Sequence, residues 1–153
     1  MAPKNKNSVA QAAETIAANC LAARIRLLHR TVTGIFDGAL RPLGLTDAQL
    51  TILVVVANRG PVSPGAVARR LNMEKSTISR NVARMHNNGW LTIAEATGRE
   101  QRLTLSAKGR ALLLKALPVW TEAQAKTNAV LGQRGADSIR SLANTVHSQL
   151  SQD

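Results

Sequence analysis

Helix start and stop signals in the middle of the chain restrict the folds that it can adopt. Thr46-Asp47-Ala48-Gln49 is a capping box ahead of a short, very apolar helix, Leu50 to Ala57. Ser63-Pro64 places an N-cap before a proline at the first helical position, which begins a helix to about Leu71. After a tight connection, a further helix runs from about Lys75 to Asn88 and ends before Gly89. Two short helices joined by a tight turn predict a helix-turn-helix.

The pattern changes to an alternation of polar and apolar residues after Gly89. Residues 90–95 and 101–105 are predicted to be two strands, joined by residues 96–100. A hairpin directly after a helix-turn-helix is a wing.

Long helices are predicted on both sides of this central part. The first runs from about Ser8 to Leu40 and carries apolar residues at heptad spacing, which favours a partner helix and so a dimer. Ser106 caps a helix from Ala107, Pro118 predicts a kink, and Gly132 and Gly135 interrupt the pattern before a last helix. The apolar positions are Leu21, Ile25, Leu28, Val32, Ile35 and Ala39 in the first helix, and Ile139, Leu142, Val146 and Leu150 in the last.

Charge indicates the kind of partner. The 153 residues include 20 Lys+Arg and 9 Asp+Glu, a net charge of +11. Residues 59–110 hold ten of the basic residues and three of the acidic ones, so the predicted helix-turn-helix and wing carry most of the excess. With one Phe, two Trp and no Tyr, the chain lacks the aromatic platforms of single-strand binders. Double-stranded DNA is therefore the expected partner.

Other classes of protein are disfavoured. One cysteine excludes an internal disulfide framework, and the three histidines lie too far apart in sequence to suggest a metal motif. Cys, His and acidic residues are not paired at catalytic spacing, and no glycine-rich phosphate loop is present. No apolar run approaches the ~20 residues of a membrane span. We expect a soluble, cytoplasmic protein that is no enzyme, has no catalytic residue, metal or cofactor, and does not bind a membrane.

The order of elements and several local motifs resemble the MarR family of winged-helix transcriptional regulators. The motifs are Leu43-Gly44-Leu45-Thr46, Ser76-Thr77-x-Ser79-Arg80, Gly89-Trp90-Leu91, Leu105-Ser106-x-x-Gly109 and, in the wing, Arg99-Glu100-Gln101-Arg102. In the wing, Thr97 stands where the family usually has Asp, and Glu100 stands where it has Asp or Ser. The resemblance implies a mainly α fold with a small β-hairpin wing (α+β), a winged helix-turn-helix flanked by long N- and C-terminal dimerisation helices.

This reading divides the chain into four parts. Residues 1–7 are a disordered basic tail, 8–45 the N-terminal dimerisation helix, 46–105 the winged helix-turn-helix DNA-binding domain, and 106–153 the C-terminal helices of the dimerisation domain. The stretch Leu112-Leu113-Leu114, with Ile139, Leu142 and Val146, is read as dimer core.

The candidate DNA-binding residues lie on three elements. These are the second helix of the helix-turn-helix, from about Lys75 to Asn88, which we call the recognition helix, the wing, and the start of the helix at Ser63. Short side chains let the helix approach base edges, Arg80 can reach guanine O6 and N7, and Lys75 and Arg84 suit phosphates. The wing-tip Arg99 suits a minor groove. Ser63 is either a phosphate contact or simply an N-cap, and Arg102 either contacts DNA or pairs with an acid. The full set is Ser63, Lys75, Ser76, Thr77, Ser79, Arg80, Arg84, Arg99 and Arg102.

The resemblance also implies an input signal. The family commonly senses small ligands between the DNA-binding domain and the dimer helices, where Arg24, His29, Arg30 and Trp120 are candidates to hold an anionic aromatic acid. The alternative is that the arginines are solvated and Trp120 is dimer core. Some relatives carry a peroxide-reactive cysteine early in the first helix, where this chain has Cys20. Their sensors are assisted by tyrosines, which this chain lacks, and a lone cysteine is commonly a small buried hydrophobe.

Together these observations predict a sequence-specific regulator of transcription, a repressor, that binds double-stranded DNA as a homodimer on a pseudo-palindromic operator. A small aromatic or anionic ligand would release it. The alternatives are a redox-responsive regulator that acts through Cys20, and a sequence-neutral architectural DNA-binding protein.

Overall fold

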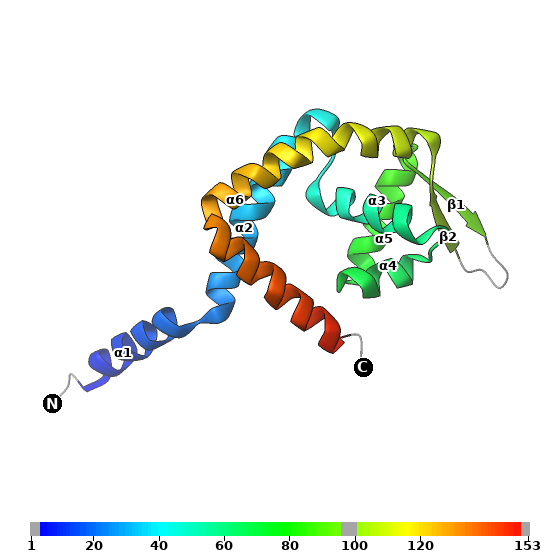
Figure 1. The fold of residues 1–153 in the computed structure, drawn as a ribbon. Helices are drawn as coiled ribbons and strands as arrows, with labels where there is room; N and C mark the ends of the chain where they lie inside the picture. The colour runs from blue at the N-terminus through cyan, green and yellow to red at the C-terminus, as the bar shows by residue number, and fades with distance from the viewer. Residues whose placement is uncertain (1–3, 96–100, 151–153) are drawn as a thin grey trace. The chain divides into compact units, whose positions relative to one another are not determined.

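The computed structural model describes residues 4–95 and 101–150, which form mainly helices and one two-stranded sheet (Figure 1). The chain divides into two compact units, Met1–Gly34 and Ile35–Asp153. In order, the elements are α1 (Lys4–Asn19), α2 (Leu21–Leu40), a 3-10 turn η1 (Arg41–Leu43), α3 (Asp47–Arg59), α4 (Pro64–Leu71), α5 (Lys75–Asn87), β1 (Leu91–Glu95), β2 (Gln101–Leu105) and α6 (Ala107–Leu150). The predicted fold, mainly helical with a β-hairpin wing, is confirmed.

Cys20 interrupts the first helical stretch, so the prediction of one helix from Ser8 to Leu40 is wrong at this point. The Sγ of Cys20 accepts the amide hydrogen of Ala23 at 3.4 Å, as an N-cap side chain does at a helix start. The Arg24 guanidinium donates to the carbonyl oxygens of Ala18 and Cys20 at 2.5 and 3.1 Å. These bonds satisfy carbonyls at the end of α1, where the helix dipole favours a cation. Helix α1 begins at Lys4, so residues 4–7 of the predicted disordered tail, residues 1–7, are helical.

Helix α3 forms the centre of the second unit and packs against α4, β2 and α6. Its start is the predicted capping box: the Gln49 amide donates to Thr46 Oγ1 at 3.3 Å, and the Thr46 amide donates to Gln49 Oε1 at 3.1 Å. The amide of Asp47 donates to Asp37 Oδ1 at 2.7 Å, which places a carboxylate at the positive end of α3. The buried side chains of this helix include Ile52 and Leu53.

The helix-turn-helix and wing follow as predicted. Asn72 takes a left-handed conformation (φ 48°) between α4 and α5, and Gly89 (φ 74°) ends the turn after α5. The strands pair antiparallel from Leu91 opposite Leu105 to Glu95 opposite Gln101. Figure 1 shows α3, α4 and α5 beside these two strands.

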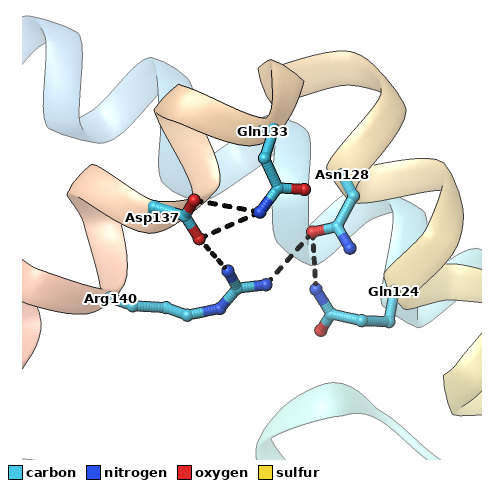
Figure 2. Close-up of polar contacts among 5 residues, drawn as sticks. All are labelled: Gln124, Asn128, Gln133, Asp137 and Arg140. Atoms are coloured by element: carbon cyan, nitrogen blue, oxygen red, sulfur yellow. Dashed lines mark hydrogen bonds and ion pairs between the residues drawn. The ribbon is translucent and has the colours of Figure 1, made fainter.

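The last helix, α6, leaves helical geometry at Gly132 (φ 67°, ψ 161°), where the sequence predicted an interruption. The helix continues through Pro118, the other predicted irregularity. Polar side chains connect the residues before and after the break (Figure 2). Arg140 donates to Asp137 Oδ1, which also lies after the break, at 2.6 Å. It also donates to Asn128 Oδ1, which lies before the break, at 3.4 Å. Gln124 donates to Asn128, and Gln133 donates to Asp137. The two segments of α6 are thus joined by side chains as well as by the backbone.

Within the described residues, no single helix has the length and hydropathy of a membrane span. One bent pair of helical segments, Leu21–Leu43 with Asp47–Arg59, reaches that length and hydropathy when the two are taken together, by length and composition only.

Candidate nucleic-acid interface

Helix α5 has one buried and one exposed face. Ile78, Val82 and Met85 are at most 4% exposed and anchor the helix in the core. The predicted DNA-binding side chains lie on the other side: Lys75, Ser76, Ser79, Arg80 and Arg84 are exposed, and Thr77 is half-buried. The side-chain Nδ2 of Asn81 donates to the Thr77 carbonyl oxygen at 3.1 Å. The exposed face is therefore made of short hydroxyls flanked by long cations.

Ser63 caps α4, because its Oγ accepts the amide hydrogen of Ala66 at 3.2 Å. The N-cap interpretation is confirmed by this bond. A phosphate contact at the same residue stays a prediction.

The wing is tied to the recognition helix and to α6. The Nδ1–H of His86, in the last turn of α5, donates to the Leu91 carbonyl at the start of β1, at 3.0 Å. The Ser106 hydroxyl lies 2.5 Å from the Gly89 carbonyl oxygen and accepts the Gly109 amide hydrogen at 2.9 Å. These bonds fix the orientation of the hairpin relative to α5. The sequence reading missed His86, because the partner is a backbone carbonyl and leaves no pattern in the sequence.

The two wing arginines differ. Arg102 is half-buried on β2, opposite Ala94 in the register, and its side chain is already engaged in an interaction. Arg99, the predicted minor-groove residue, lies outside the described residues.

A cavity of about 460 Å³ lies between α3 and α6. Trp120 lines it together with apolar side chains that include Val54, Leu113 and Leu117, and Asp47 and Thr51 supply the polar groups. We refer to it as the Trp120 cavity. The other predicted ligand residues, Arg24, His29 and Arg30, are exposed on α2 within the first unit. Their role in ligand binding stays a prediction.

Large apolar side chains are exposed on both long helical parts of the chain. In the first unit, Leu21 and Ile25 of the predicted stripe are 73% and 63% exposed. On α6, Leu114 is 73% and Leu142 66% exposed. Singly exposed apolar residues are common, whereas a series of them on one surface is typical of an interaction site.

Comparison with known proteins identifies relatives of this chain. Residues 43–101 match the MarR family. The transcriptional regulator MosR of M. tuberculosis is 31% identical, and the match covers 85% of this chain and 97% of that one with a TM-score of 0.72. The same regulator has been solved in complex with DNA, with a TM-score of 0.69 to this chain.

Two further relatives are more distant. The regulator BpsR of Bordetella bronchiseptica, whose DNA binding is regulated by 6-hydroxynicotinic acid, is 20% identical over 84% of this chain and 95% of its own, with a TM-score of 0.74, which shows the same fold. An uncharacterised HTH-type transcriptional regulator of Bacillus subtilis, YwoH, is 28% identical over 69 residues, 45% of this chain. The chain spans half the length of that relative.

Proposed function

Because the chain belongs to the MarR family of winged helix-turn-helix, DNA-binding transcriptional regulators, which are not enzymes, we propose that it represses transcription as a homodimer on a pseudo-palindromic operator and that a small aromatic or anionic ligand releases it. The exposed face of α5 carries the DNA-binding part of the proposal, since its buried opposite face leaves only the polar one free to enter a major groove. Such a regulator acts where the chromosome lies, in the cytoplasm.

The proposed contacts divide into base readout and phosphate binding. Arg80 and its hydroxyl neighbours Ser76 and Ser79 face the bases, whereas Lys75 and Arg84, near the two ends of the exposed face, bind phosphates. Ser63 and Thr77, the wing residues Arg99 and Arg102, and the first turn of α4 complete the proposed set.

Homodimer formation is supported by the exposed apolar side chains of α6 and of the first unit. A twofold dimer would place two recognition helices in successive major grooves on one side of the DNA, with half-site centres ~10 base pairs apart. Covering these side chains would remove apolar surface from water, at about 25 cal/mol per Å².

Release by a ligand is supported by the Trp120 cavity, whose volume lies in the range of small-molecule sites, roughly 300–1,000 Å³. In the related BpsR, 6-hydroxynicotinic acid regulates DNA binding. A ligand here would act through its differential affinity for the DNA-competent and the released arrangements.

Selection of binding sites from random duplex DNA tests the proposal. We expect an enriched inverted repeat with half-sites one helical turn apart. If affinity instead falls in proportion to any competitor DNA at fixed salt, with no preferred site, the architectural alternative holds.

A second candidate, redox control through Cys20, is favoured by the position of the thiol. Cys20 is half-exposed and forms the break between α1 and α2, so a change at its Sγ acts directly on the bond to Ala23 that begins α2. Titration with iodoacetamide should modify the thiol in the folded protein, and hydroperoxide should lower DNA affinity of the wild type but not of Cys20→Ser. Equal affinities before and after treatment would rule this candidate out.

A further inference from the structure

The hairpin of the wing is attached to the second unit along the outer edge of β2. The Val62 amide, just before α4, donates to the Leu103 carbonyl oxygen at 3.2 Å, and the Leu103 amide donates to the Val62 carbonyl oxygen at 2.8 Å. Strand β1 lies on the other side of β2 and packs against α5. Because the hairpin can turn about the edge at Val62, its angle to the recognition helix depends on how β1 is held.

His86 holds β1. Its Nδ1–H donates to the Leu91 carbonyl oxygen at 3.0 Å, a normal hydrogen-bond length, and Leu91 is the buried first residue of the strand. Within the described residues, this is the side-chain hydrogen bond that joins α5 to the hairpin, since the Asn81 side chain bonds to a carbonyl of its own helix. The bond connects the last turn of the recognition helix directly to the base of the wing.

A small movement at this bond becomes a large one at the far end of the strand. Strand β1 runs from Leu91 to Glu95, so four steps of about 3.3 Å each place its end about 13 Å from the bond. A rotation of about 10° at the base would displace that end by about 2 Å. A charge-assisted hydrogen bond to a phosphate is about 2.7–2.9 Å long, so a shift of this size would break it.

We propose that His86 is a positioning residue for DNA recognition, whose bond to Leu91 sets the angle between the recognition helix and the wing so that both reach their grooves together. The inference rests on the proposed function, in which α5 enters a major groove and the wing an adjacent minor groove. His86 acts on DNA affinity only through the wing. Its effect should therefore appear only on DNA that extends far enough for the wing to reach.

Fluorescence anisotropy with two duplexes tests the proposal. The long duplex carries the selected operator with its flanking base pairs, and the short duplex ends at the outer edges of the two half-sites. The readout is the ratio of the two Kd values. We expect His86→Ala to lose at least fivefold in affinity for the long duplex and less than twofold for the short one.

Two further variants separate the hydrogen bond from a general effect on α5. In His86→Asn, the amide nitrogen Nδ2 is attached to Cγ, as Nδ1 is in histidine, so it can donate to the same carbonyl. This variant should bind the long duplex within threefold of the wild type. Asn87→Ala is the matched control, because Asn87 is the next residue of α5 and is also exposed. It should change the ratio of the two Kd values by less than twofold.

Four outcomes would overturn the proposal. His86→Ala binds both duplexes as the wild type does; it loses affinity equally for both, as a loss of structure in α5 would cause; or His86→Asn binds the long duplex as weakly as His86→Ala. In the fourth, the wild type binds the operator specifically but equally tightly on both duplexes, which removes this inference and leaves operator recognition intact. A wild type without any preferred site would remove the proposed function and this inference together.

Discussion

The backbone carbonyl of Trp90 lies against Gly109 so closely that a Cβ on Gly109 would be 2.0 Å from its oxygen. The same oxygen accepts the amide hydrogen of Ser106 at 3.1 Å. The end of the recognition helix, the start of the wing and the first turn of α6 therefore meet at one backbone group.

Gly109→Ala is expected to destabilise the protein by about 1–3 kcal/mol, because the backbone of Trp90 must move to admit the methyl group. Urea denaturation measures the effect. Gly38→Ala is the matched control: Gly38 lies in α2, its Cβ would meet nothing within 4 Å, and alanine there should leave stability unchanged or raise it by up to ~1 kcal/mol. Equal midpoints for the two variants would contradict the close approach.

Arg80→Ala should cost roughly 1–3 kcal/mol of operator binding and relax the preference at one base pair, because the side chain reads a base edge. Lys75→Ala should weaken binding to all sequences alike and flatten the salt dependence, as loss of a phosphate contact does. Fluorescence anisotropy on the selected operator and on single-base variants distinguishes the two. If both variants keep wild-type affinity, the assignment of these residues is wrong.

Leu142→Glu should shift the protein from dimer to monomer in sedimentation experiments, since it places a charge on an exposed apolar side chain of α6 that we assign to the dimer interface. Ser141→Glu adds the same charge one position away and should preserve the dimer. A dimer in both variants would place the interface elsewhere.

Gly132→Ala should lower the unfolding free energy by about 1–3 kcal/mol, because φ 67° with ψ 161° is a conformation that only glycine adopts readily. Gly135→Ala, three residues further along α6, serves as the control. Its Cβ would lie 3.5 Å from the Leu131 Cβ, an ordinary contact, so stability should change by less than ~1 kcal/mol in either direction. Thermal denaturation compares them, and a stable Gly132→Ala protein would mean that the break is not required.

Trp120→Ala should reduce the affinity of an effector that occupies the Trp120 cavity while leaving operator binding without effector intact, since Trp120 is remote in sequence from α5 and lines the cavity. Titration with 6-hydroxynicotinic acid, the compound that regulates BpsR, gives a first probe. Unchanged release of DNA in the variant would show that the effector binds elsewhere.

Local signals in the sequence were sufficient for most of the DNA-binding half. The caps at Thr46 and Ser63 predict α3 and α4, because each joins groups three residues apart. The end of α5 was also predictable from a local signal, because Gly89 adopts a left-handed conformation that favours glycine.

Interactions between distant residues were not predictable in this way. The break at Cys20 has no proline or glycine, and Arg24 stabilises it by reaching back six residues to Ala18. The contact between Arg70 and His147 joins residues 77 positions apart, and no local pattern in the sequence predicts it.

The junction at Trp90 has a consequence for how sequences of this kind can diverge. The hydroxyl of Ser106 donates a hydrogen bond at this junction, and Gly109 leaves room for the Trp90 carbonyl because it has no side chain. A substitution of either residue alone would lower the stability of the protein, whereas the exposed residues of α5 can be substituted as the operator sequence changes. Relatives that bind other operators should therefore differ on the exposed face of the recognition helix and keep Ser106 and Gly109.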